Sequence, residues 1–360
     1  MSDSENDILF MKRCLQLAAN GKATCSPNPM VGAVVVHQGR IIGEGWHRKT
    51  GEPHAEPNAI HSVKNQDLLK ESTLYVSLEP CSHYGKTPPC ADLIIQKQIP
   101  RVVVGCLDPF PQVRGKGIAR MQAAGVEVTL GVEVAACLNL NRHFIVFHNQ
   151  KRPYIILKWA QTADGFMDIL RQPGDQKESL KISTPFTQAL VHKLRSETDA
   201  ILVGTNTAIL DNPSLSVRTW TGRHPIRAVM DRRMILPKSS VLLNGEISTL
   251  LFTDGPSKKD GERTWIHLDF SQDTIKQLLD VLYKRQIQTL LVEGGAKLHT
   301  SFIKNGAWDE IHIETSSKLI GNGVSVPDLS GIDISCQETI NYDTELKGRR
   351  VQIFHSVEPI

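Results

Sequence analysis

The sequence predicts two consecutive α/β domains, each built in three layers with helices on both faces of a sheet. The chain has 360 residues, whereas a single hydrophobic core rarely grows beyond ~250–300 residues. Short apolar runs typical of buried strands alternate with helical patterns, and this alternation restarts after the polar segment 150–153. We find no internal repeat. We therefore place the boundary there and predict domains of residues 1–150 and 151–360.

The elements of the first half follow one another at short intervals. Residues 7–20 have apolar side chains at helical spacing, with Asp7 as the expected cap and Gly21 as the stop. The apolar runs 31–36 and 41–46 flank a turn and predict a hairpin. The remaining predicted elements are a helix from 55, a strand at 73–78, a helix from 90, a strand at 101–107, a helix at 115–124 and a strand at 126–130.

The second half shows the same alternation. Apolar runs predict strands at 154–160, 200–204, 226–231, 250–253, 289–293 and 310–314. Helical spacing predicts helices at 185–197, 273–285 and 296–305.

Composition restricts the class of protein. The 41 basic and 38 acidic residues leave a net charge of +3 without a basic block, which argues against nucleic acid and favours a small-molecule substrate. No apolar run approaches the ~18 residues of a membrane-spanning helix, and the acidic N-terminus is followed by no signal-peptide core. The seven cysteines are an odd number without a disulfide pattern. We therefore expect a cytoplasmic protein with reduced thiols and no membrane contact.

Three residues of the first half form a candidate zinc site. His54, Cys81 and Cys90 offer one imidazole and two thiolates, which leaves the fourth tetrahedral position open, as in catalytic zinc sites. Glu56 could move a proton between the activated water and a leaving nitrogen. Pro57 fits only the first helical turn, so His54 should precede a helix and Glu56 should lie in its opening turn. His83 is the alternative fourth ligand if the zinc is purely structural.

The pattern His54-Ala55-Glu56 followed by Pro80-Cys81 and Cys90 resembles the zinc-dependent cytidine/deoxycytidylate deaminase superfamily. Eight residues separate the cysteines, and the string Pro80–Cys90 is similar to the deaminase half of the bifunctional riboflavin-biosynthesis deaminase–reductases. The string Ser26-Pro27-Asn28-Pro29-Met30-Val31-Gly32 is similar to the same family.

This resemblance implies hydrolytic deamination of a pyrimidinone ring by a zinc-activated water, with Glu56 as the catalytic proton shuttle. It further implies that Asn28 contacts the base or ribose and that His83, Lys86 and Thr87 hold the substrate. Phe110 stands where the family usually has Asn, so a substrate contact is lost or replaced there.

The second half carries a weaker motif of its own. Glu293-Gly294-Gly295 lies at the end of a predicted strand and leads into a helix. A glycine pair lets a pyrophosphate approach the helix N-terminus, although a tight turn would use the same residues. Arg232 and Arg233 follow another strand and could bind the extra phosphate of NADPH or lie on the surface.

The second half of the chain also resembles this family, because it is similar to the reductase domain of the bifunctional enzymes. The similar strings are Lys158–Gly165, Gly204–Thr207, Asp211–Pro213 and Glu293–Gly295. The resemblance implies a dihydrofolate-reductase-like fold that uses NADPH. By position, Ala160, Thr207, Asp211 and Gly295 would line the cofactor, and the substrate would contact Ser179, Arg195, Leu215, Arg218 and Glu293. Phe166 and Lys181 depart from the family pattern, and at the latter an aromatic cofactor contact is missing.

The family resemblance implies a two-step enzyme of riboflavin synthesis. The first domain would deaminate 2,5-diamino-6-ribosylamino-4(3H)-pyrimidinone 5′-phosphate, with one zinc ion per chain. The second would reduce the ribosyl to the ribityl side chain with NADPH, and the protein would be a homodimer. One alternative is a deaminase of nucleosides or tRNA with a non-catalytic C-terminal binding domain. Another is a non-catalytic nucleotide-binding protein with structural zinc.

Overall fold

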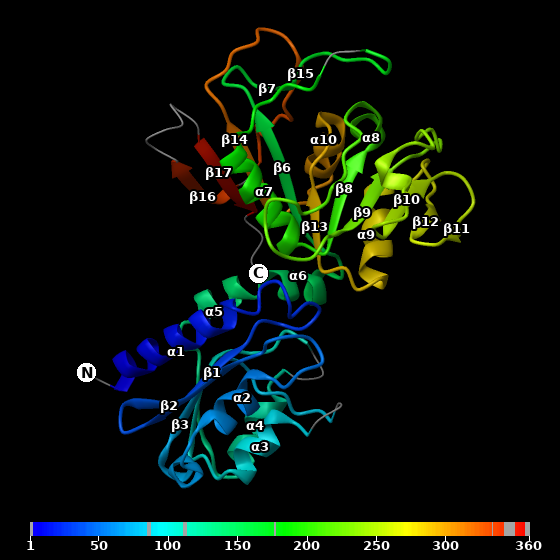
Figure 1. Ribbon diagram of the computed structural model, residues 1–360. Coiled ribbons are helices and arrows are strands. Elements are labelled where there is room, and N and C mark those ends of the chain that lie inside the picture. Colours follow the sequence, from blue (N-terminus) through cyan, green and yellow to red (C-terminus); the bar gives the residue numbers. More distant parts are fainter. Residues whose placement is uncertain are drawn as a thin grey trace. The chain divides into compact units, whose positions relative to one another are not determined.

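The computed structural model describes residues 3–84, 88–110, 114–175, 178–332, 334–341 and 350–356. The chain divides between Lys151 and Arg152 into two compact units (Figure 1). None of the described helices combines the length and apolar character needed to cross a membrane.

The first unit is built on a five-stranded sheet. Its strands, in the order β2-β1-β3-β4-β5 across the sheet, are β2 Arg40–Trp46, β1 Gly32–His37, β3 Thr73–Leu78, β4 Arg101–Cys106 and β5 Glu127–Leu130. β1 runs antiparallel to β2 and β3, while β3, β4 and β5 are parallel. The predicted hairpin and all three later strands of this half are confirmed.

Helices cover both faces of this sheet (Figure 1). One face packs against α1 Asp3–Ala19 and α5 Val134–Leu140. The other packs against α2 Ala55–Ser62, α3 Cys90–Gln96 and α4 Lys116–Ala123. Successive residues such as Val34 and Val35 belong to the two opposite cores, because side chains alternate along a strand. The predicted three-layer arrangement is confirmed. The unit also contains the 3-10 helix η1 Gln66–Glu71 and α6 Arg142–Gln150.

Asp7 does not cap α1, contrary to the prediction. The helix begins at Asp3, and the buried Asp7 carboxylate lies inside it. Asp7 accepts hydrogen bonds from the Tyr75 hydroxyl at 2.8 Å and from the Arg101 guanidinium at 2.7 and 3.0 Å. The side chain therefore joins α1 to β3 and β4 instead of satisfying the start of its own helix.

The second unit contains a ten-stranded sheet in the order β11-β12-β10-β9-β8-β13-β6-β14-β17-β16. Its central strands from β12 to β14 are parallel, and β11, β17 and β16 run antiparallel to their neighbours. The bounds are β6 Tyr154–Gln161, β8 Ala200–Gly204, β9 Ile226–Met230, β10 Thr249–Thr253, β11 Lys258–Asp260, β12 Arg263–His267, β13 Thr289–Val292, β14 Glu310–Thr315, β16 Ile334–Asn341 and β17 Arg350–Ser356. A small separate ribbon pairs β7 Phe166–Asp168 with β15 Val324–Ser325.

Helices lie on both faces of this sheet as well. α9 Thr274–Lys284 and α10 Ala296–Lys304 contribute to one core together with Ile155, Leu157 and Ile313. α7 Pro185–Glu197 contacts the opposite face, where Thr187 donates a hydrogen bond of 2.8 Å to Glu314 of β14. The short helices α8 Thr205–Leu210 and η2 Val241–Leu243 connect strands.

The sequence did not predict several short elements, the helices α5 and α6, or the strands at the two ends of the large sheet. α5 and α6 are separated by Asn141, whose side chain accepts from the Met30 N–H at 2.8 Å and donates to the Met30 carbonyl at 2.9 Å. These two bonds join residues 111 positions apart in the sequence. No local sequence pattern therefore predicts the break between α5 and α6. β11, β12, β16 and β17 lie at the two ends of the large sheet.

Candidate active sites

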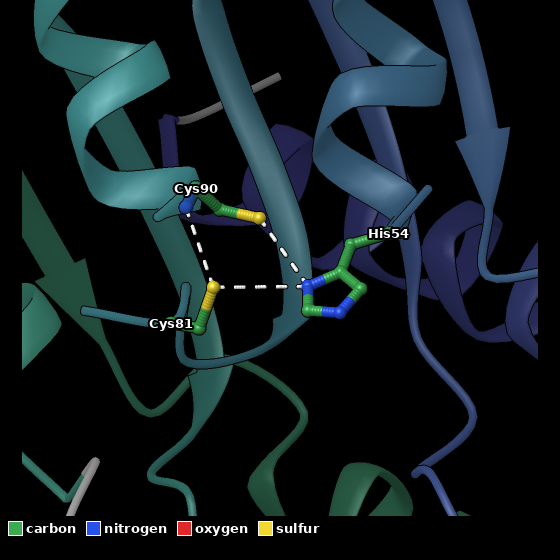
Figure 2. Close-up of side chains that lie close together, drawn as sticks. All are labelled: His54, Cys81 and Cys90. Carbon is green, nitrogen blue, oxygen red and sulfur yellow. Dashed lines mark hydrogen bonds between the residues drawn. The ribbon is translucent and has the colours of Figure 1, made fainter. Parts of the chain in front are cut away.

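The three predicted zinc ligands meet in the first unit (Figure 2). His54 is the extended residue that precedes α2, Cys81 follows the end of β3, and Cys90 is the first residue of α3. The His54 Nδ1 lies 3.7 Å from the Cys81 Sγ and 3.4 Å from the Cys90 Sγ. The backbone N–H of Cys90 donates to the Cys81 Sγ at 3.3 Å.

These positions fit a zinc ion. Ligand atoms ~2.0–2.3 Å from a tetrahedral zinc lie roughly 3.3–3.8 Å from one another, and both measured nitrogen–sulfur separations, 3.4 and 3.7 Å, lie in this range. Within the described ranges, no fourth His, Cys, Asp or Glu joins this group, and His83 is exposed. Three protein ligands and an accessible fourth position distinguish a catalytic from a structural zinc site.

The charges at the site also suit a cation. Contact with Cys81 raises the pKa of His54 to about 9 despite burial, so the sulfurs stabilise positive charge at this point. Hydrogen bonds from Cys90 and His54 lower the pKa of Cys81, although burial opposes this. A thiolate is the form in which cysteine binds metals.

Glu56 lies in the first turn of α2, as Pro57 predicted. Its side chain is 3% exposed, and burial raises its pKa to about 7, while the neighbouring His54 opposes the shift. The Cys90 thiol also opposes this shift. A carboxyl group that gains and loses a proton near neutral pH suits general acid–base chemistry.

Cys81 is positioned by a buried carboxylate that sequence reasoning missed. Glu79 accepts hydrogen bonds from the backbone N–H groups of Gly115 at 2.8 Å and Gly117 at 3.0 Å. A Cβ on Gly117 would lie 2.1 Å from the Pro80 carbonyl oxygen. The start of α4 therefore packs directly against the Pro80-Cys81 turn, and only glycine allows this approach.

The predicted substrate residues of this unit have different surroundings. Asn28 is half-buried, and its amide nitrogen lies 3.1 Å from the Nε2 of His47, whose ring packs against that of His54. Lys86 and Thr87 lie outside the described residues. Phe110, at the position of the missing Asn, places its ring 5.4 Å from that of His148 in α6.

The second unit has an open cleft of about 1380 Å³. It follows the carboxyl ends of β6, β13, β8 and β9, the edge at which parallel sheets bind ligands. The predicted residues that line it are Ala160, Ser179, Arg195, Thr207, Asp211, Glu293 and Gly295.

Leu215 and Arg218 are not among the lining residues. Leu215 is buried at φ +52°, and Arg218 donates to the hydroxyl groups of Ser214 and Ser216. Their loop is nevertheless tied to the cleft wall, because Arg195 donates to the Ser216 carbonyl at 3.1 Å.

The glycine pair lines the cleft, directly before α10. A Cβ on Gly294 would lie 3.0 Å from Val203 and 3.1 Å from Thr207. Gly295 has φ +77°, and a Cβ there would lie 3.3 Å from the Thr207 hydroxyl. Both the close packing and the left-handed backbone require glycine. The half-buried start of α10 lines the cleft, a position that suits a pyrophosphate.

Two arginines form ion pairs along the cleft. Arg195 binds Glu293 through both carboxylate oxygens, at 2.8 and 2.6 Å, with the two side chains 12% and 10% exposed. Arg171, which the sequence did not indicate, bridges Asp168 and Asp211, with 2.6 Å to the latter. Asp211 thus lines the cleft with its charge neutralised.

Lys158 is a further functional candidate that sequence reasoning missed. It lines the cleft beside Glu293, and none of the described residues accepts a hydrogen bond from its ammonium group. Burial lowers the pKa of Lys158, although the charges of Glu293 and Glu314 oppose the shift. The signal was a lysine within the otherwise apolar run 154–160, because a charged residue is rarely placed there without a function or a partner.

Comparisons with known proteins cover both units. The family model of the cytidine and deoxycytidylate deaminase zinc-binding region matches residues 4–106, and that of the RibD C-terminal domain matches residues 153–348. The riboflavin biosynthesis protein RibD of Aquifex aeolicus is 41% identical over 333 residues, which are 90% of this chain and 91% of that protein.

Solved structures agree with these matches. A diaminohydroxyphosphoribosylaminopyrimidine deaminase/5-amino-6-(5-phosphoribosylamino)uracil reductase from Thermotoga maritima has a TM-score of 0.85 and 35% identity, with 98% of this chain and 99% of that chain covered. RibD of Acinetobacter baumannii has a TM-score of 0.86 and 30% identity over the same shares.

Proposed function

The chain belongs to the RibD family of bifunctional riboflavin-biosynthesis deaminase–reductases, and on this premise we propose which part performs each reaction. Zinc and NADPH are the cofactors of the two activities. Residues 1–150 deaminate 2,5-diamino-6-ribosylamino-4(3H)-pyrimidinone 5′-phosphate, and residues 151–360 then reduce its ribosyl group to ribityl. The observation that carries the proposal is the convergence of His54, Cys81 and Cys90 beside the buried Glu56.

In the deamination, water adds to the amino-bearing ring carbon and ammonia leaves. His54, Cys81 and Cys90 would hold the zinc ion, which would polarise that water and lower its pKa. Glu56 takes a proton from the water as the C–O bond forms, and it passes the proton to the leaving nitrogen as the C–N bond breaks. Its pKa of about 7 supports both directions of transfer at neutral pH.

In the reduction, NADPH bound in the cleft would supply a hydride to C1′ of the sugar. As the C1′–H bond forms, the bond from C1′ to the ring oxygen breaks, and that oxygen needs a proton. We propose Lys158 as the donor, because it is a half-buried ammonium in the cleft with a lowered pKa. The Arg195–Glu293 pair beside it would orient the sugar and its phosphate, and the Gly294-Gly295 turn would hold the pyrophosphate of NADPH.

Ammonia release and NADPH consumption by the full-length zinc enzyme test both steps. We expect ammonia release without NADPH, and NADPH oxidation only when the deaminated intermediate is present. A Glu56→Gln protein that releases ammonia at the normal rate would contradict the deaminase mechanism. A failure of the purified intermediate to oxidise NADPH would contradict the reductase role.

We also propose a cytoplasmic location and a homodimer. The family resemblance and the absence of a disulfide pattern support these two statements. Light scattering of the purified protein tests the second, and a monomer at micromolar concentration would contradict it.

A further inference from the structure

His47 is a buried residue of the first unit that the mechanism does not use. Its side chain is 2% exposed. Its backbone N–H donates to the Val31 carbonyl at 2.9 Å, and its carbonyl accepts from the Cys25 thiol at 2.8 Å. These two bonds hold the backbone of His47 in place, and its ring lies edge to face with that of His54, at 5.4 Å between centroids.

The two ring nitrogens of His47 face different groups. The Nδ1 lies 3.1 Å from the carbonyl oxygen of Pro53, and the Nε2 lies 3.1 Å from the side-chain nitrogen of Asn28. A carbonyl oxygen can only accept, so the Nδ1 must carry the proton. The Nε2 lies against the amide nitrogen of Asn28, which can only donate, so the ring carries a single proton and its Nε2 is an acceptor.

This tautomer fixes the orientation of the Asn28 amide. Only the NH₂ group can donate to an unprotonated Nε2, so the amide cannot rotate by 180° without placing two acceptors against each other. The amide oxygen of Asn28 then points away from His47, and among the described residues none donates a hydrogen bond to it. The site consequently offers an acceptor, and not a donor, at this position.

We infer that His47 is a positioning residue that holds Asn28 as a hydrogen-bond acceptor for an O–H or N–H donor of the deaminase substrate. The inference rests on the proposed function, because it assigns the open oxygen of Asn28 to that substrate.

The two nitrogens of His47 can be replaced separately. In His47→Gln, the terminal amide oxygen can occupy the place of Nε2 and accept from Asn28, while the bond to Pro53 is lost. In His47→Asn, the amide nitrogen can occupy the place of Nδ1 and donate to Pro53, while the acceptor for Asn28 is lost. Comparison of these two variants shows whether His47 acts by positioning Asn28 or by supporting the Pro53-His54 turn.

Steady-state ammonia release by the full-length zinc enzyme provides the test, with bound zinc and reductase activity on the deaminated intermediate as controls for an intact fold. We expect His47→Asn to raise KM ~10- to 30-fold with kcat changed less than ~3-fold, and His47→Gln to restore KM to within ~3-fold of the wild type. In an Asn28→Ala background, both variants should have no further effect on KM, because the coupled partner is gone.

Two results would overturn the inference. The first is equal KM values for His47→Gln and His47→Asn. The second is a double variant whose fold-increase in KM equals the product of the increases caused by the separate His47 and Asn28 substitutions. A wild-type enzyme that releases no ammonia would instead contradict the proposed function itself, so the two failures remain distinguishable.

Substrate analogues identify the donor. If a ribose hydroxyl is the donor, the corresponding deoxyribose substrate has a ~10-fold higher KM with the wild type and no further increase with Asn28→Ala. If a ring N–H or amino group is the donor, the substrate methylated at that nitrogen has the higher KM with the wild type and no further increase with Asn28→Ala. An Asn28→Ala enzyme that still discriminates against every such analogue would overturn the assignment of Asn28.

Discussion

The two units build their sites in different ways. In the first, three ligand atoms lie within 4.8 Å of one another, and all come from residues 54–90. In the second, the cleft of about 1380 Å³ is lined by residues from Lys158 to Val324 and crosses the ends of several parallel strands. The first site depends on a few side chains with a defined geometry, and the second on backbone approach, ion pairs and one half-buried lysine.

This difference bears on how each site responds to change. A metal site loses its function when one ligand is removed, because coordination requires every member. A long cleft distributes binding over many contacts, so most single changes should weaken it gradually, and only a group that takes part in the chemistry should have a large effect.

Removal of one zinc ligand should have the largest effect. We expect Cys90→Ala to lose bound zinc and to reduce deaminase kcat/KM more than ~10³-fold, since the metal activates the water. Reductase activity on the deaminated intermediate should not change. Zinc content and the two activities are the measurements. Cys137→Ala, another buried cysteine but in α5, is the matched control and should keep its zinc.

Replacement of Lys158 tests whether one side chain dominates the cleft. Lys158→Met keeps the length of the side chain but cannot donate a proton, so we expect reductase kcat to fall ~10²-fold, with deaminase activity unchanged. Lys181 also lines the cleft but its side chain is 80% exposed. We expect Lys181→Met to change kcat less than ~3-fold, and equal losses in the two variants would refute the role of Lys158.

The Asp7 cluster allows the first unit to be destabilised alone. Burial raises the pKa of Asp7, but the hydrogen bonds from Arg101 and Tyr75 outweigh this and lower it below its usual value. The carboxylate therefore stabilises the fold above the pKa of unfolded Asp, ~3.9, and this contribution is lost as pH falls through the lowered folded pKa.

We accordingly expect Asp7→Asn to lower the free energy of unfolding of the first unit by about 2 kcal/mol at pH 7, and by less as the pH falls below about 4. Urea unfolding followed by deaminase activity measures the change, and reductase activity should respond less. Glu127 pairs with the same Arg101 but is 72% exposed. Glu127→Gln should cost less than about 0.5 kcal/mol, and a loss as large as that of Asp7→Asn would contradict this account.

The smallest effect concerns the glycine turn of the cleft. Gly295→Ala would introduce a methyl group 3.3 Å from the Thr207 hydroxyl at a left-handed backbone position. We expect KM for NADPH to rise ~10-fold, because the start of α10 moves or becomes blocked. Gly331 has a similar φ of +80° with open space around it. Gly331→Ala introduces the same backbone strain away from this turn, so we expect its KM for NADPH to be unchanged. An equal rise of KM in Gly331→Ala would contradict the assignment of the effect to the glycine turn.

The sequence predicted the zinc trio because its determinants are local. Pro57 and Pro89 mark the starts of α2 and α3, and a helix start places a ligand toward one point. The three-layer fold and most strands were predicted for a similar reason, since buried strands are continuous apolar runs. Asp7 was assigned wrongly because its partners, Tyr75 and Arg101, are 68 and 94 residues away.

What the sequence alone determined is the kind of chemistry: two α/β halves, a zinc ligand set with its acid–base carboxylate, and the family to which both halves are similar. What only the tertiary structure decided is which groups face one another. Lys158 came to lie beside Glu293, and His47 came to lie between Asn28 and Pro53. Such contacts depend on the register of strands and on the packing of distant segments, so no local periodicity records them.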